Sequence, residues 1–326
     1  MSSPPSEQPT SDVVGKSQLD EPGAMQVLPE LTPAVVQRVQ EGLAAARDHA
    51  VRASIQSALD ETVAIAQGQF NRPVSGEFRR QVLRSLIHSL FQVRVEYPER
   101  IPHGPALLAA NHLNHIDPFL LLSEVPGAPY YHILADARTL YNKWWKRQVL
   151  RQAGGVIPVE RRWREEITVI AAAKVDRPDL ADLAAALEQD VPAGNAIAAL
   201  RQIDRAVQAI FAHGDGIILF PEGGLGTLEG QLRLPLKRGT VIYALRAGVP
   251  IVPVALIGTK DLYFRKTLTV RFGEPLQFLP SRRPKPQEAQ AAIDALQTAW
   301  LQLLPQDYQE PKGVKLFRKF LNHLFW

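Results

Sequence analysis

The chain of 326 residues has 46% hydrophobic and 21% charged side chains, a balance typical of a soluble protein with a large core. It contains no cysteine, which excludes disulfides, thiolate zinc sites and any mechanism through an S-acyl enzyme. The first residues lack the pattern of a secretory signal, and no run of about 18 apolar residues occurs. We therefore expect an intracellular protein without a transmembrane span.

The formal net charge of +4 is concentrated at the C-terminus. Residues 311–326 hold four basic and no acidic side chains, so the rest of the chain is neutral. A nucleic-acid-binding protein carries a broad basic patch, so a basic excess confined to one tail argues against a nucleic-acid partner. A basic excess in the tail favours a local anionic partner instead.

The N-terminal part is expected to be a tail followed by helices. Residues 1–30 are rich in Ser, Pro, Gln and Glu, a composition that predicts a disordered tail. Thr32 and Pro33 form a helix start, and the Ala-rich run to about residue 66 predicts one long or two short helices. Residues 31–92 are therefore expected to form an N-terminal helical segment.

The last helix of this segment is predicted at residues 77–91. Its apolar residues recur at intervals of three and four, which is typical of an amphipathic helix. The pattern places Arg79, Arg80 and Arg84 away from the apolar face.

From residue 93 short apolar runs alternate with helical patterns, which predicts an α/β fold with a mixed, mostly parallel sheet layered by helices. The predicted strands are 106–110, 130–134, 155–159, 217–220, 251–256 and 268–272. The predicted helices lie near 138–152, 195–213, 236–248 and 287–304. The α/β domain is expected at residues 93–280, with an inserted hairpin or lid at about 164–194, and C-terminal helices at 281–326.

The predicted strand 106–110 is followed directly by His112. In open α/β sheets the carboxyl ends of the strands form the ligand crevice, so His112 lies where chemistry usually occurs. Asp117 can accept a hydrogen bond from one ring nitrogen and leave the other as a general base. Two other interpretations stay open: the pair caps a turn and a helix start, or it binds a metal together with His115.

A glycine-rich segment follows the predicted strand 217–220. Gly223 and Gly224 allow close backbone approach and present N–H groups to an anion. An acid directly after a buried strand needs a partner, so Glu222 is either structural or a ligand for substrate hydroxyls. Arg161, beyond a strand end, and Lys237, near a helix start, fit a phosphate or CoA site.

Together these residues resemble the glycerolipid acyltransferase family, typified by 1-acylglycerol-3-phosphate acyltransferase. Four family motifs occur in family order over about residues 93–275. They match Asn111, His112 and Asp117 (Asn-His-x-x-x-x-Asp), Gly155 and Arg161 (Gly-x-x-x-x-x-Arg), Phe220 to Gly223 (Phe-Pro-Glu-Gly) and Val249 to Val254 (Val-Pro-Ile-Val-Pro-Val).

The resemblance implies that His112 is the catalytic base and Asp117 its orienting acid. The base would deprotonate an acceptor hydroxyl, which attacks an acyl thioester on CoA or acyl carrier protein, with no cofactor and no metal. The implied substrate-binding residues are Asn111, Arg161, Glu222, Gly223, Gly224 and Lys237.

The chain departs from the family pattern after Glu222. The family usually continues with Thr-Arg-Ser, whereas this chain has Gly224-Leu225-Gly226 and so lacks a basic residue that would meet a phosphate. Asn114 stands where the first motif usually has Ser. Acyl transfer is compatible with both changes, but they leave the identity of the acceptor open.

The C-terminal sequence predicts an amphipathic helix of about 13 residues, roughly 20 Å long, that can lie on a bilayer but not cross it. Its predicted membrane contacts are Lys315, Phe317, Arg318, Lys319, Phe320 and Trp326. The alternative is a terminal helix that packs on the domain.

We therefore expect a peripheral acyltransferase on the cytoplasmic side of a membrane, with an anionic membrane surface, an acyl thioester donor and a lysolipid acceptor as partners. It would act in phospholipid synthesis. The alternatives are a non-phosphate lipid alcohol as acceptor, or a catalytically silent lipid-binding protein of the same fold.

Overall fold

The computed structural model describes residues 28–193 and 197–325. Most of the predicted tail 1–30, and Trp326, lie outside the described residues. The strands are β1 Gln92–Glu96, β2 Leu107–Ala110, β3 Tyr131–Asp136, β4 Val156–Val159, β5 Gly216–Leu219, β6 Ile251–Ile257 and β7 Thr267–Phe272. The helices are α1 Pro33–Arg47, α2 His49–Ala66, α3 Gly76–Leu90, α4 Asp117–Glu124, α5 Ala137–Tyr141, α6 Trp144–Ala153, α7 Arg164–Val175, α8 Ala181–Asp190, α9 Ile197–Ala212, α10 Gly239–Ala247, α11 Pro286–Leu303 and α12 Arg318–Phe325.

The strands form one seven-stranded sheet in the order β1-β7-β6-β2-β5-β3-β4. Every neighbouring pair is parallel except β6 and β7, so β1 and β7 run opposite to the other five strands. The predicted α/β class with a mixed, mostly parallel sheet is therefore confirmed. The sequence reading missed β1, an edge strand that alternates charged and apolar residues and is partly exposed.

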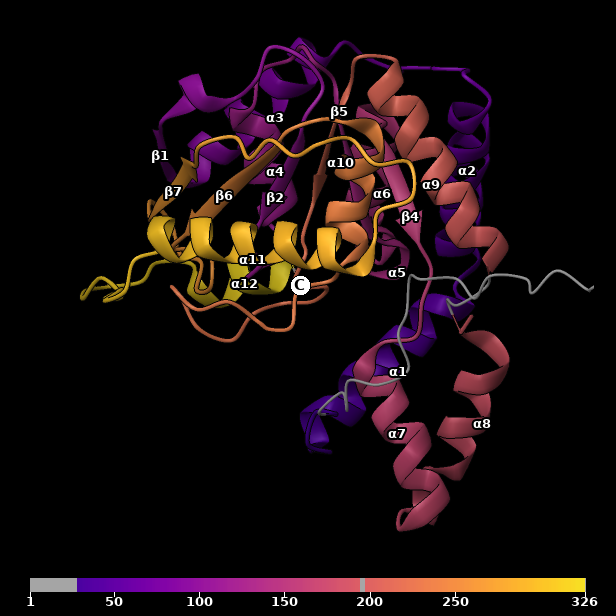
Figure 1. The fold of residues 1–326 in the computed structure, drawn as a ribbon. Helices are drawn as coiled ribbons and strands as arrows, with labels where there is room; N and C mark the ends of the chain where they lie inside the picture. The colour runs from indigo at the N-terminus through magenta and orange to yellow at the C-terminus, as the bar shows by residue number, and fades with distance from the viewer. Residues whose placement is uncertain (1–27, 194–196, 326) are drawn as a thin grey trace, which may run out of the picture.

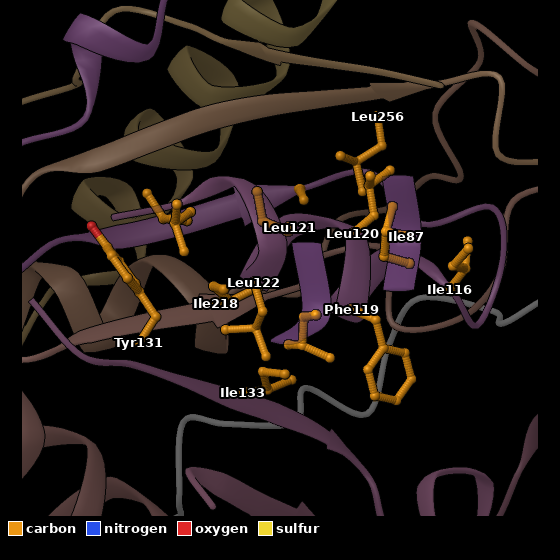
Figure 2. Packing of buried hydrophobic residues seen from close by; sticks show 14 of the residues in the cluster. Ile87, Ile116, Phe119, Leu120, Leu121, Leu122, Tyr131, Ile133, Ile218 and Leu256 are labelled. Carbon is orange, nitrogen blue, oxygen red and sulfur yellow. The ribbon is translucent and has the colours of Figure 1, made fainter. Parts of the chain in front are cut away.

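Helices cover both faces of the sheet (Figure 1). Successive residues of a strand point to opposite faces, so Leu108 packs beneath α3 and α4, and Leu107 packs with α9, α10 and α11. Figure 2 shows the first of these layers, in which Phe119 to Leu122 of α4 pack near Ile133 and Ile218 of the sheet. These central strands are buried along their whole length, as their continuous apolar runs predict.

The stretch predicted as an insertion forms the helical hairpin α7 and α8, which packs on α1 around a third apolar cluster. Figure 1 shows these three helices projecting from the body of the molecule. The Ala-rich N-terminal run is two helices, and Asp48 separates them by accepting from the backbone N–H of Val51 at 2.9 Å. The single helix predicted at 138–152 is likewise divided into α5 and α6.

The predicted outward position of Arg79 on α3 is wrong. Its guanidinium is buried 3.8 Å from the ring centroid of Tyr130 and donates to the carbonyl of Tyr131 at 2.9 Å. Phe78, Val82 and Leu86, predicted on the apolar face, are exposed instead. A long cationic side chain can be buried where an aromatic ring and a carbonyl receive it, which helical periodicity alone does not reveal.

The C-terminal helix α12 has eight residues rather than about 13, and its apolar side chains divide between core and solvent. Leu321 and Phe325 join the core, whereas Phe317 and Phe320 are exposed. Lys146 donates to the carbonyl of Phe325 at 3.0 Å and so fixes the end of the helix. No helix within residues 28–193 or 197–325 has the length and apolar character needed to cross a bilayer.

Candidate active site

The site forms where two loops leave the carboxyl ends of β2 and β5. These strands are parallel neighbours, with Leu107 beside Ile217, so the residues that follow them meet at one edge of the sheet. The backbone N–H of His112 donates to Oε1 of Glu222 at 2.8 Å. The two predicted motifs are therefore joined by a direct hydrogen bond, although 110 residues separate them in sequence.

The imidazole of His112 is held by Asp117. Its Nδ1 lies 2.8 Å from Oδ2 of Asp117, the first residue of α4. The same oxygen accepts from the backbone N–H groups of Leu113 at 2.7 Å and Asn114 at 2.9 Å. An acceptor of this kind is a carboxylate, so Nδ1 carries the hydrogen and Nε2 keeps its lone pair. The arrangement is that of a general base with a carboxylate that orients it.

The ring of His112 lies against Phe220 and remains partly accessible. The two rings stack with centroids 4.2 Å apart, and the His112 side chain is 15% exposed. Phe220 comes from the loop after β5, and its stacking on the imidazole restricts the tilt of that ring. The imidazole is thus positioned by both loops and remains partly exposed.

His115 lies close to His112 but faces a different environment. The ring centroids are 6.2 Å apart, and burial together with the nearby charge of Lys146 holds the pKa of His115 well below its usual range. Within the described ranges, His, Asp and Glu side chains do not gather in groups of three that could hold a metal ion. The metal interpretation of His112, His115 and Asp117 therefore has no support in this geometry.

The carboxylate of Glu222 joins two loops. Besides His112, it accepts from the backbone N–H of Arg233 at 2.7 Å, and the side chain is buried. Burial raises the pKa of Glu222, and the two N–H donors oppose that rise. Each oxygen accepts from one backbone N–H, so Glu222 holds the two loops together, and its contact with substrate stays a prediction.

The side chain of Asn111 also bonds to the backbone. Its amide nitrogen donates to the carbonyl of Leu256 at 2.9 Å, and its amide oxygen accepts from the N–H of Leu256 at 2.7 Å. The side chain is buried. Asn111 thus clamps the end of β2 against β6, and its contact with substrate stays a prediction.

The other predicted binding residues gather around the glycine turn. Nη2 of Arg161 donates to the carbonyl of Gly223 at 2.7 Å, and the Arg161 side chain is 39% exposed. Gly223 has a φ of 65°, a conformation that favours glycine, and a Cβ there would lie 3.1 Å from the Lys237 side chain. The structure thus brings Arg161, Gly223 and Lys237 together.

One neighbour of this turn was missed by the sequence reading. Arg233 places its guanidinium over Gly224, where a Cβ would overlap Nη1, and donates to the carbonyl of Leu225 at 3.2 Å. Arg233 belongs to no recognisable motif and lies in a segment without helix or strand. Only the folding back of this segment onto Glu222 reveals its position.

The predicted membrane-contact residues of the tail separate into two groups. Lys315 pairs with Asp261 at 2.8 Å and Glu310 at 3.0 Å, and Arg318 pairs with Asp261 at 2.7 Å. Their charges therefore meet carboxylates of this chain, and their contact with anionic lipid stays a prediction. Lys319, Phe317 and Phe320 are exposed.

The two joined loops and the sheet that holds them match a known family. A family model described as Acyltransferase matches residues 92–257, just over half of the chain and the whole region from β1 to β6. The chain belongs to the acyltransferase family.

Relatives with described activities match parts of this region. A protein of Mycoplasma pneumoniae described as a probable 1-acyl-sn-glycerol-3-phosphate acyltransferase is 26% identical over 172 residues, which cover 52% of this chain and 50% of that protein. The 1-acyl-sn-glycerol-3-phosphate acyltransferase of Limnanthes douglasii is 39% identical over 77 residues, 24% of this chain and 27% of that enzyme. The chain thus spans half or less of the length of these relatives.

A solved structure also resembles the chain. The 1-acyl-sn-glycerophosphate acyltransferase PlsC of Thermotoga maritima aligns with a TM-score of 0.39 and 16% sequence identity, covering 84% of this chain and 89% of that one.

Proposed function

We propose that this protein is an O-acyltransferase that moves a fatty acyl group from acyl-CoA or acyl carrier protein to the hydroxyl of a lysophospholipid, in phospholipid synthesis. The acceptor is 1-acylglycerol 3-phosphate or a related glycerolipid. The observation that carries the proposal is the Nδ1 hydrogen bond of His112 to Asp117 on a loop held by Glu222. Family membership and the described activity of the two relatives support it.

The reaction needs one base and no covalent enzyme intermediate. Nε2 of His112 takes the proton of the acceptor hydroxyl while that oxygen attacks the thioester carbon. When the C–S bond breaks, the imidazolium returns the proton to the departing thiolate, which leaves as a thiol. The carboxylate of Asp117 stabilises the imidazolium between the two proton transfers.

A second acceptor class is favoured by one feature of the sequence. Gly224-Leu225-Gly226 replaces the Thr-Arg-Ser of the family pattern, so the turn itself offers no basic side chain to a phosphate. A neutral lipid alcohol is the corresponding alternative acceptor. A protein that binds lipid without catalysis is the other alternative, and it predicts no acyl transfer to any acceptor.

An acceptor panel tests the proposal directly. Purified protein is given labelled acyl-CoA or acyl carrier protein, and 1-acylglycerol 3-phosphate, glycerol 3-phosphate or monoacylglycerol in detergent micelles. We expect an acyl ester with 1-acylglycerol 3-phosphate as the best acceptor. A preference for monoacylglycerol contradicts the acceptor, and the absence of product with every pair contradicts the enzyme.

We also propose that the protein meets the membrane through exposed apolar residues around α12. Phe317 is 65% and Phe320 60% exposed, and Phe317 packs edge-on against Phe264 with ring centroids 6.0 Å apart. Aromatic side chains grouped in this way are typical of an interfacial contact. Lys146 of α6 donates to the carbonyl of Phe325 and so holds the end of this helix on the body of the protein.

The double variant Phe317→Ser and Phe320→Ser is expected to sediment with anionic vesicles severalfold less than the unaltered protein, because each substitution removes exposed apolar area without touching the core. Deleting the helix is a poorer test, since Leu321 and Phe325 belong to the core. The matched control replaces Val175 and Leu279, two exposed apolar residues outside this group, with serine. Equal sedimentation of both double variants and the unaltered protein contradicts the contact.

A further inference from the structure

The space above Gly224 is filled by a side chain from elsewhere in the chain. A Cβ at residue 224 would overlap Nη1 of Arg233, so the glycine leaves room for that guanidinium. Compared with the Thr-Arg-Ser of the family pattern, the turn has no basic side chain of its own. The guanidinium of Arg233, nine residues further along the chain, lies where a side chain at residue 224 would be. The two features are complementary, because any larger residue at 224 would displace Arg233.

Arg233 is anchored to the turn through its backbone, whose N–H donates to the carboxylate of Glu222. Among the described residues, its guanidinium donates to the carbonyl of Leu225. Among residues 28–193 and 197–325, no carboxylate lies within ion-pair distance of this guanidinium. Most of its N–H donors are therefore available to a bound anion.

Two further arginines face the same region. Burial, followed by the charges of Arg164 and Arg161, lowers the pKa of Arg233, while Glu165 and Glu222 oppose this shift. Nε of Arg164 is buried without a hydrogen-bond partner in the described part of the chain. The guanidinium groups of Arg161 and Arg233 thus lie at the turn next to His112, and the charge of Arg164, whose Nε is the unused buried donor, acts on Arg233. Such a cluster is stabilised when an anion binds.

We propose that Arg233, together with Arg164 and Arg161, binds a phosphate monoester of the acceptor and thereby sets the preference for a phosphorylated lipid. The inference rests on the proposed acyltransferase function. Guanidinium forks match the oxygens of a phosphate, and three of them can bind a dianion that one lysine cannot hold in a fixed orientation. Arg161 belongs to a family motif, whereas Arg164 and Arg233 are assigned by the structure alone.

Replacing Arg233 with Gln is expected to raise KM for 1-acylglycerol 3-phosphate at least about tenfold, because a charge-assisted hydrogen bond to the phosphate is lost. KM for acyl-CoA and turnover of monoacylglycerol should stay unchanged. The control Arg205→Gln removes the same charge from an exposed position on α9 and should leave all three values unchanged. A rise in KM for acyl-CoA instead assigns the arginines to a phosphate of the donor and overturns the proposal.

Gly224→Ala provides an independent variant. The added methyl meets the mobile end of Arg233, so the protein should fold while the guanidinium is displaced. We expect the same selective rise in KM as for Arg233→Gln, and an unchanged KM contradicts the proposal.

Titration calorimetry with glycerol 3-phosphate, compared with glycerol, tests the site without turnover. Binding that is lost in both variants supports the site even if no acyl transfer is found, and no binding to the unaltered protein overturns it.

Discussion

Replacing His112 with alanine is expected to lower kcat for acyl transfer by about 100- to 10,000-fold, the range that a positioned general base contributes. The two loops jointly orient the imidazole, through the Asp117 hydrogen bond and the stacking of Phe220. The loss should appear in kcat rather than in KM, because the base acts on the proton that moves in the transition state. Initial rates at saturating acceptor and donor measure it.

The matched control is His103→Ala, which removes an exposed imidazole from the loop before β2. It should keep the rate of the unaltered protein. Circular dichroism and the thermal midpoint should show that His112→Ala folds, since the His112 side chain is partly exposed and the backbone bond of its loop to Glu222 is kept. A folded His112→Ala variant with a nearly unaltered kcat would exclude His112 as the base.

The second large effect is expected at Glu222. In Glu222→Gln one oxygen becomes an NH₂ group that faces a backbone N–H, so either the His112 or the Arg233 hydrogen bond is lost. An unmade buried hydrogen bond of this kind costs about 1–3 kcal/mol of unfolding free energy. The loop that carries the base also loses its support, so kcat should fall at least about tenfold.

Glu229 offers a closely matched comparison. Its two oxygens accept from the N–H groups of Gly258 at 3.0 Å and Lys260 at 2.8 Å, so it joins two backbone segments just as Glu222 does. Glu229→Gln should cost a similar unfolding free energy by chemical denaturation but leave kcat near that of the unaltered protein. If both variants lose activity in proportion to their loss of stability, the claim that Glu222 supports the loop carrying His112 is wrong.

The sheet could be predicted from the sequence because its central strands are buried on both faces. Strands β2, β5 and β6 are continuous apolar runs, which a local pattern reveals. Strand β1 has the half-exposed alternation of an edge and gave no such signal. On α3 the periodicity placed Leu83 and Ile87 in the core but put Arg79 on the wrong side, because its burial depends on the distant Tyr130.

The candidate base and its partner could also be predicted, since His112 and Asp117 lie five residues apart and their loop follows a recognisable strand. The hydrogen-bond partners of Asn111 and Glu222 could not be predicted from the sequence. Both are polar residues at strand ends, and the sequence does not show whether a backbone or a substrate will satisfy such groups. The structure gives both to the backbone.

By itself the amino-acid sequence determined the α/β class, the position of the candidate base and the resemblance that led to the family, because each depends on residues that are close along the chain. The tertiary structure decided which charges are satisfied internally and which face the site. Lys315 and Arg318 pair with Asp261, whereas the guanidinium of Arg233 forms no ion pair with a carboxylate of the described residues and fills the space above Gly224. The free energy of a charged group depends on its neighbours in space, and those are brought together only by folding.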